Sequence, residues 1–360
     1  MSTGWIPLSA LRGQEAALRL LRPLADVVPG DPVPPLLFHG PDGVGKRTAA
    51  LGLAAALACT VRGPGEDPCG RCTGCARVTA ADGVTALREG TTTSREAPRI
   101  YPDIGLVSVP RGRTRISILQ ARDVILSARE RPFELARRVY VIEPADLLTS
   151  EAANSLLKVL EEPPATTALV LVTSAPWTLP VTVRSRLQPV RFRALPRPAI
   201  RQILEDRGIP PEEARRRAAL AGGSVARALA LDPERQAADR EAWLEILGRL
   251  ARDPARAASL AVVAGDRWGG SAAEAEAALA LLLALLRDLA ALAEGAPPTD
   301  PATAEFLAPL APAASRLLGP TLARTALLDT LRRELVTIHR NPRLALEGAV
   351  LLLAGHAIAG

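Results

Sequence analysis

Two apolar runs that do not alternate with polar residues constrain the fold of this chain more than any other feature. VYVI, within residues 137–146, and LVLV, within residues 168–174, are typical of strands buried on both faces. PPLLFHG and IGLVSV (104–109) predict two further strands. Helical patterns over 117–130 and 149–162 lie between them, and strands that alternate with helices predict a parallel, doubly wound sheet. The first part of the chain is therefore expected to be an α/β domain.

The rest of the chain lacks comparable strand signals. Residues 5–29 predict one helix, and residues 60–102, rich in Gly, Thr and Pro, predict a loop. After Phe192 only amphipathic helical stretches follow, so the expected fold class is α/β followed by all-α. We expect an α/β domain at 1–193, a small helical domain at 194–235 and a helical C-terminal domain at 236–360.

Composition excludes several classes of protein. Of the 360 residues, 48% are hydrophobic, which excludes a disordered chain. No run approaches 18 uncharged apolar residues and no secretory leader is evident, so we expect a soluble, cytoplasmic protein. The net charge of +6 is carried almost wholly by arginine. This net positive charge is compatible with a function near nucleic acid, and it is equally compatible with an ordinary basic surface.

All four cysteines of the chain lie within CTVRGPGEDPCGRCTGC. The two C-x-x-C steps allow Cys69, Cys72 and Cys75 to converge on one ion, and Cys59 can complete a tetrahedron. Disulfides are disfavoured in a chain without a leader, and a chance cluster of every cysteine is implausible. The spacing predicts a structural zinc site without catalytic capacity, because four sulfur ligands leave no open position.

The stretch FHGPDGVGKRT (38–48) resembles a phosphate-binding loop between a strand and a helix. Gly40, Gly43 and Gly45 allow backbone N–H groups to approach phosphate oxygens, and Lys46 would reach the terminal phosphates. Arg47, however, stands where a hydroxyl should hold magnesium. The loop is either a vestigial turn or a site that binds ATP without hydrolysing it, and the sequence leaves both open.

A second departure follows the strand within residues 137–146. Phosphoryl-transfer ATPases hold magnesium with an acid at the end of such a strand and often polarise water with another. Glu143 could serve imperfectly as the first acid, whereas Pro144 offers no base in the second position. The two departures together argue against intrinsic ATPase activity.

Several segments, in this order, resemble the AAA+ subunits of the bacterial sliding-clamp loader. These are GPDGVGKRT, the cysteine loop, VYVIEPADLLTSEAANSLLKVLEEPP, LVLVTSAP and TVRSRLQPVRF. EAANSLLKVLEEPP (151–164) is the most specific of them, and NPRLALEGAVLLL (341–353) resembles the C-terminal collar of the family. The motor subunit of this family is expected to have Ser or Thr after the loop lysine and an Asp-Glu pair after the strand. Arg47 and Glu143–Pro144 therefore indicate a non-motor subunit.

The resemblance implies an AAA+ P-loop domain with a zinc-binding insertion, a helical lid and a helical collar. It also implies partners: motor and delta subunits in a hetero-pentameric ring that opens a sliding clamp and places it on primed DNA. Ser185-Arg186-Leu187 corresponds to the family's Ser-Arg-Cys motif, so Arg186 would act as an arginine finger on a neighbour's ATP. Ala226 stands where the motor keeps an arginine, which argues against sensing of this chain's own nucleotide.

Other interpretations stay open at this point. The chain could be an active motor ATPase, or a zinc-bearing DNA-binding protein whose P-loop fold is incidental. It could also be an assembly scaffold in which Arg186 only forms a salt bridge.

Overall fold

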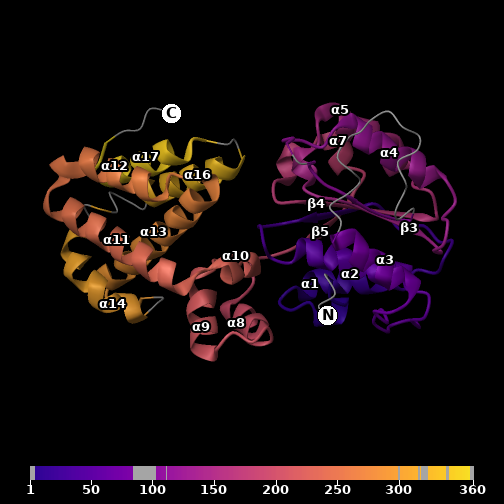
Figure 1. Cartoon of the computed structure of the whole chain (residues 1–360), viewed down its shortest axis with the longest axis horizontal. Coiled ribbons are helices and arrows are strands. Elements are labelled where there is room, and N and C mark those ends of the chain that lie inside the picture. Colours follow the sequence, from indigo (N-terminus) through magenta and orange to yellow (C-terminus); the bar gives the residue numbers. More distant parts are fainter. Residues whose placement is uncertain are drawn as a thin grey trace. The chain divides into compact units, whose positions relative to one another are not determined.

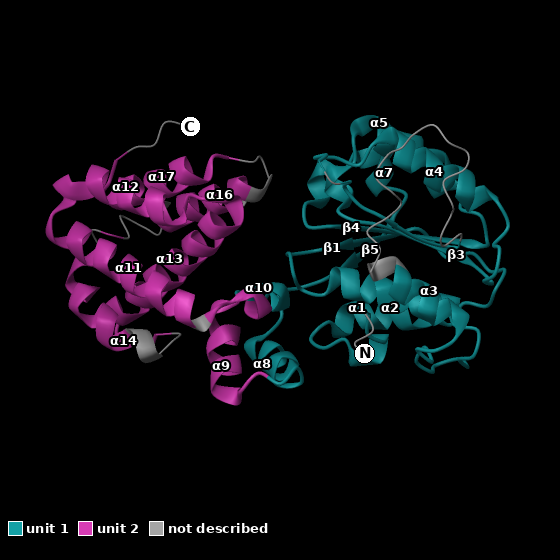
Figure 2. Cartoon of the chain, viewed as in Figure 1, with its two compact units in different colours: residues 1–208, 222–227 teal, residues 209–221, 228–360 magenta. Residues whose placement is uncertain are grey.

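The computed structural model describes residues 5–83, 103–110, 112–298, 301–314, 317, 323–337 and 340–356. It divides into two compact units (Figure 2). Unit 1 comprises Met1–Gly208 and Gly222–Arg227, and unit 2 comprises Ile209–Ala221 and Ala228–Gly360. No helix of the described residues is both long enough and apolar enough to span a bilayer. The predicted boundaries near 193 and 235 stay predictions.

Unit 1 is built on a five-stranded parallel sheet with strand order β2-β3-β4-β1-β5. The strands are β1 (Leu36–His39), β2 (Ile104–Val107), β3 (Arg138–Ile142), β4 (Thr167–Thr173) and β5 (Gln188–Arg191). Every residue of β2, β3 and β4 is buried, as the apolar runs predicted. The expectation of an α/β domain is confirmed.

Helices cover both faces of this sheet. Figure 1 shows α1, α2 and α3 on one face and α4, α5 and α7 on the other. The helical elements up to residue 205 are η1 (Leu8–Ala10), α1 (Glu15–Ala25), α2 (Lys46–Ala58), α3 (Thr73–Gly83), α4 (Ile118–Arg129), η2 (Ala145–Leu147), α5 (Ser150–Ser155), α6 (Leu157–Glu161), η3 (Pro176–Thr178), α7 (Val181–Arg184) and α8 (Arg197–Glu205). Two of these helices have N-terminal caps: Ser117 forms a capping box with Gln120 at α4, and Thr149 accepts from the Ala152 N–H at α5.

Three local predictions were wrong, and one strand was missed. The helix expected over 5–29 is confined to α1, because the preceding segment turns at Gly13, which has a φ of 71°. The helix expected over 149–162 is interrupted at Leu156. The loop expected over 60–102 contains α3, while residues 84–102 lie outside the described part. The sequence reading also missed β5, an edge strand that contains Pro189.

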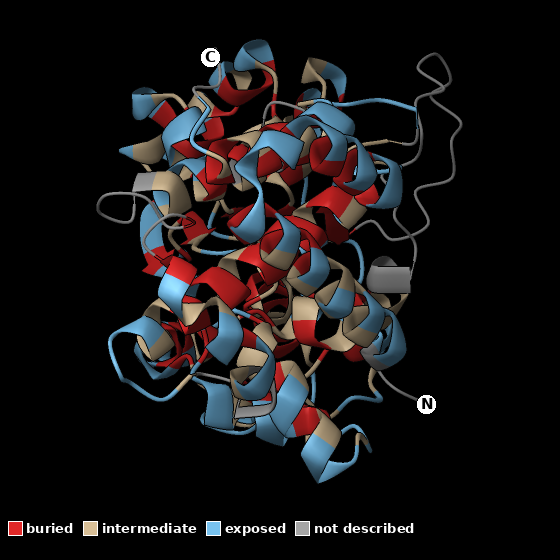
Figure 3. Ribbon diagram, turned by 90° about the vertical axis from the view of Figure 1, so that its left-hand side faces the viewer, coloured by how far each residue is buried: buried red, intermediate tan, exposed pale blue. Residues whose placement is uncertain are grey.

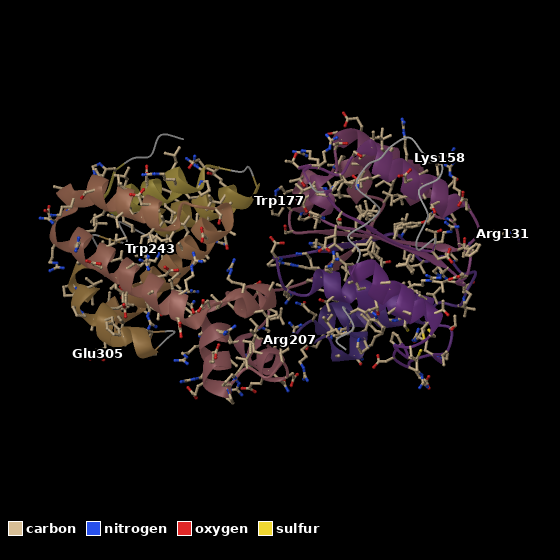
Figure 4. All side chains as sticks on the ribbon, in the orientation of Figure 1. Arg131, Lys158, Trp177, Arg207, Trp243 and Glu305 are labelled. Carbon is tan, nitrogen blue, oxygen red and sulfur yellow. The ribbon has the colours of Figure 1, made fainter. Side chains whose placement is uncertain are left out.

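The remaining chain is helical, which confirms the second half of the predicted fold class. Its elements are α9 (Pro211–Leu220), α10 (Val225–Ala230), α11 (Pro233–Arg252), η4 (Pro254–Arg256), α12 (Ala257–Trp268), α13 (Ala272–Ala293), α14 (Pro301–Leu307), η5 (Ala308–Ala313), α16 (Ala323–Thr337) and α17 (Pro342–Leu353). Buried residues form the core of unit 2, and the ribbon of such residues is red in Figure 3. Trp243 stacks on Trp268 there, with ring centroids 4.5 Å apart (Trp243 is labelled in Figure 4).

Candidate functional site

The glycine loop connects the carboxyl end of β1 to the first residue of α2. Gly40, Gly43 and Gly45 have φ angles of 143°, 70° and 96°, which residues other than glycine rarely adopt. A strand, a glycine loop and a helix N-terminus in this order form an arrangement that can bind an anion. Nucleotide binding itself stays a prediction.

Lys46 forms hydrogen bonds with the backbone of the glycine loop. Its Nζ donates to the carbonyl oxygens of Gly40 at 2.7 Å and Pro41 at 2.6 Å, and it lies 3.6 Å from a carboxylate oxygen of Asp42. The side chain is only 6% exposed. Burial lowers the pKa of Lys46, although Asp42 and Glu143 act in the opposite direction. The amine therefore stabilises the conformation of the loop through these hydrogen bonds.

Arg47 and Glu143 form an ion pair beside the loop. Arg47 Nη1 lies 2.9 Å from Glu143 Oε2, and both side chains are partly buried. Glu143 follows β3, and Arg47 is the second residue of α2, so the sheet brings together residues that are distant in the sequence. The only acid predicted to hold a metal at this site is thus paired with a guanidinium, which carries a permanent positive charge.

A further acid, Asp146, lies near the same end of the sheet. Thr173, the last residue of β4, donates a hydrogen bond from its hydroxyl to Asp146 Oδ1 at 2.5 Å and accepts one from the Ala175 N–H. The sequence reading assigned no role to Thr173 and did not single out Asp146. Asp146 could have been singled out from the sequence as an acidic residue four positions after the end of β3.

The segment 222–227 contacts the glycine loop within unit 1. The Ala226 N–H donates to the Gly43 carbonyl at 3.2 Å, and a Cβ on Gly43 would lie 2.2 Å from Ser224 Oγ and 2.7 Å from Ala226 Cβ. Ala226, at the position where the family's motor is expected to have an arginine, therefore presents a methyl group to the loop. The sequence reading did not foresee the contact with Ser224.

The four cysteines lie together at the end of α2 and the start of α3, as their spacing predicted. All four are free thiols, and their sulfur atoms lie within 4.8 Å of one another, with 3.7 Å between those of Cys59 and Cys72. A tetrahedral zinc with Zn–S bonds of about 2.3 Å would place sulfurs roughly 3.8 Å apart. The cluster can therefore hold a metal ion of this size.

Backbone N–H groups point at several of these sulfurs. The Cys69 N–H donates to Cys59 Sγ at 3.4 Å, and the Cys72 N–H donates to Cys69 Sγ at 3.3 Å. Burial works to raise the pKa of Cys72, but N–H donors from Cys75 and Thr60 outweigh it and lower this pKa to about 6. Burial raises the pKa of the Cys75 thiol. Such N–H donors are suited to stabilise thiolate ligands.

Arg186 lies between α7 and β5, at the other end of the sheet from the glycine loop. Because β5 runs parallel to β1, with Gln188 beside Leu36 and Arg191 beside His39, the residue that precedes β5 is near the amino end of β1. A four-residue strand spans ~13 Å. Arg186 therefore cannot act on a phosphate held by its own loop.

A comparison with protein families assigns part of this chain. Residues 29–196, a little under half of its length, match the family model described as "DNA polymerase III, delta subunit". The matched segment contains the glycine loop, the four cysteines, Glu143 and Arg186.

Curated relatives agree with this match. DNA polymerase III subunit delta' of Bacillus subtilis is 35% identical over 181 residues, which cover 50% of this chain and 48% of the relative. Subunit delta' of Pseudomonas aeruginosa is 33% identical over 193 residues, which cover 52% of each. Subunit gamma/tau of Mycobacterium bovis is 29% identical over 182 residues, which cover 49% of this chain and 28% of the relative. The matches thus span about half the length of the delta' relatives, and over residues 29–196 this chain is similar to the DNA polymerase III delta subunit family.

Proposed function

We propose that this chain is a delta-prime-type subunit of a DNA polymerase III clamp loader, that it does not hydrolyse ATP, and that it supplies Arg186 to the ATP site of a neighbouring subunit. The delta' relatives support membership of the complex. The ion pair between Arg47 and Glu143 is the main support for the proposal that this chain does not hydrolyse ATP.

The ion pair disfavours hydrolysis for a physical reason. Magnesium must be held by anionic or hydroxyl oxygens between the loop and the strand end. Here a fixed guanidinium neutralises Glu143 and would repel the metal, and Pro144 provides no base for water. An ATP molecule without its metal would lack the charge neutralisation that phosphoryl transfer requires.

The location of Arg186 supports a role of this residue at the ATP site of another subunit. Arg186 lies at the end of the sheet opposite to its own loop. A guanidinium on a partner's terminal phosphate stabilises the charge that develops during transfer, and such a contribution is worth about 10³–10⁵ in rate. In this proposal the subunit is a stator: its helical collar, 236–360, joins motor and delta subunits in a cytoplasmic ring that loads a sliding clamp on primed DNA, and the lid is 194–235.

The cysteine cluster binds zinc in this proposal and fixes the loop that follows α2. Cys59, Cys69, Cys72 and Cys75 would supply four thiolate ligands, so the ion would have a structural function only. Cys75 also packs with Trp5 and Val78 in a buried cluster of unit 1, which would couple the metal to the apolar core.

A reconstituted loader tests the arginine. We expect Arg186→Ala to lower the DNA-dependent ATPase rate of the complex by at least about a hundredfold per affected site, with assembly unchanged. Arg186→Lys keeps the charge and loses the fork of N–H donors, so it should recover little activity. A full rate for Arg186→Ala would leave the chain as a scaffold.

The purified chain tests the alternatives. With magnesium and ATP it should show no turnover, whereas a rate of about one per second would identify an active motor. Salt-dependent binding of the isolated chain to primed DNA that is lost on chelation would favour a zinc-dependent DNA-binding protein.

A further inference from the structure

Arg186 contacts Glu161 and two residues close to it in the chain, Thr182 and Ser185. Nε donates to Glu161 Oε1 at 2.7 Å, and Nη2 contacts the same oxygen. Nη1 donates to the Thr182 carbonyl at 2.7 Å and lies 3.5 Å from Ser185 Oγ. The Arg186 side chain is 33% exposed. A long side chain at the surface is thus held at its head group from two directions.

The choice of nitrogens matters for the function of Arg186. A guanidinium can bind an oxyanion through the fork formed by Nε and Nη2 or through the fork formed by Nη1 and Nη2. Glu161 occupies the first fork. In the second fork, Nη1 donates to the Thr182 carbonyl and, at a long 3.5 Å, to Ser185 Oγ. A phosphate from another molecule would replace the Ser185 contact and use the remaining N–H of Nη2. The ion pair with Glu161 therefore orients the guanidinium while it leaves part of the second fork for the transition state.

Glu161 is itself well placed for this task. It is the last residue of α6, and Pro163 and Pro164 follow it and restrict the backbone. Thr182 belongs to α7, which contacts α6 directly. A partly exposed ion pair of this kind adds little to stability, so its main effect is on the orientation of Arg186.

We propose that Glu161 is a positioning residue for the arginine finger: it holds the Nε–Nη2 fork of Arg186 so that the Nη1–Nη2 fork faces the phosphate of a neighbouring subunit. This inference rests on the proposed role of Arg186 in trans. It assigns a function to Glu161, which the sequence reading did not single out.

The test uses the reconstituted loader with saturating subunits, clamp, primed DNA and ATP. Glu161→Ala should lower kcat about tenfold with the KM for ATP unchanged, because an unrestrained guanidinium loses its orientation in the transition state. Glu161→Gln retains an acceptor oxygen for Nε and Nη2 and should keep the rate within about twofold of the unmodified complex. A purely structural role would change the subunit concentration for half-maximal activity and leave kcat at saturation intact.

Two controls separate the possible failures. Glu162→Ala removes the neighbouring acid, which takes no part in the Arg186 contacts described above, and should leave kcat unchanged. Arg186→Ala is the reference: if it leaves the rate intact, the proposed function fails and the inference with it. If Arg186→Ala abolishes activity while Glu161→Ala matches or exceeds the unmodified complex, only the positioning role is overturned. Equal loss in Glu161→Gln and Glu161→Ala would overturn it as well.

Discussion

Arg47 changes the chemistry of the glycine loop more than any other single residue. At this position a hydroxyl would be a neutral magnesium ligand, whereas a guanidinium is always charged and seeks a carboxylate. Glu143 is that carboxylate, at 2.9 Å. Arg47 thus stands in place of one metal ligand and neutralises another, and in the proposed function this makes the loop unsuited to catalysis although its backbone is kept.

Replacement of Arg47 should restore metal-dependent binding without restoring hydrolysis. Arg47→Thr supplies a hydroxyl and frees Glu143, so we expect magnesium-dependent ATP affinity to rise at least about tenfold, equivalent to roughly 1.4 kcal/mol. Calorimetric titration with and without magnesium measures this. Arg47→Ala, which frees Glu143 but adds no ligand, is the matched control and should gain less. Turnover near one per second in Arg47→Thr would contradict the view that Pro144 leaves no base for water.

Gly43 is required by the contact between the loop and the segment 222–227. Gly43→Ala adds a Cβ 2.2 Å from Ser224 Oγ at a φ of 70°, so the free energy of unfolding should fall by about 1–3 kcal/mol. Gly45→Ala is the control: its φ is 96°, but the nearest atom to the new Cβ is Leu11 Cδ1 at 3.4 Å. Urea denaturation should therefore show the larger loss for Gly43→Ala, and equal losses would argue against the steric contact.

The sequence predicted the residues of this site better than their pairing. Gly40, Gly43, Gly45 and Lys46 could be identified because a phosphate loop has a local pattern. The pairing of Arg47 with Glu143 joins residues 96 positions apart and depends on how β3 and β1 are ordered in the sheet. Local spacing contains no information on which distant residues meet, so the sequence showed that Arg47 replaces a metal ligand but not that it pairs with Glu143.

At the scale of elements, the cysteine cluster depends on the close approach of α3 to the end of α2. Cys59 follows α2, Cys72 precedes α3, and Cys75 lies in its first turn. Gly74 makes this approach possible, because a Cβ at this position would lie only 1.8 Å from the Ala58 carbonyl oxygen. The cysteine cluster is therefore formed by two helices as well as by the loop between them.

Gly74→Ala should impair the cluster although alanine is the better helix former. Helix propensity alone would favour alanine by about 1 kcal/mol. The steric clash should instead separate the helices, lower zinc affinity at least about tenfold and reduce stability by roughly 1–3 kcal/mol. Gly63→Ala is the control, since its Cβ would meet only the flexible Glu66 side chain at 3.4 Å. Competition with a zinc chelator measures the affinity, and an unchanged value for Gly74→Ala would contradict the role given to this contact.

The elements that the sequence reading missed have physical explanations. The buried strands β3 and β4 could be predicted because burial on two faces requires uninterrupted apolar residues. β5 is an edge strand with exposed side chains at Gln188, Pro189 and Arg191, so it lacks that signal. α3 has many small and polar residues, and its register follows from the contact at Gly74 and the packing of Cys75 and Val78 rather than from amphipathic periodicity.

At the scale of the whole molecule, the two compact units have separate apolar cores. The core of unit 2 consists of residues between Trp243 and Leu353, dominated by leucine and alanine. Two clusters of unit 1 lie between Trp5 and Leu187, and one of them includes the cysteines. The division of the core could not be predicted from the sequence, because it depends on contacts between distant helices.

Separate cores predict two unfolding transitions that respond to different treatments. Trp243 is fully buried, stacks on Trp268 and donates its indole N–H to the Ala278 carbonyl at 3.0 Å, so Trp243→Ala should cost unit 2 about 3–5 kcal/mol. Zinc chelation should instead lower the transition of unit 1, whose core adjoins the thiols. Trp177→Ala is the control, because this tryptophan is 70% exposed and its loss should move neither transition. Differential scanning calorimetry distinguishes the cases: a single transition that Trp243→Ala and chelation lower together would show that the two cores unfold as one.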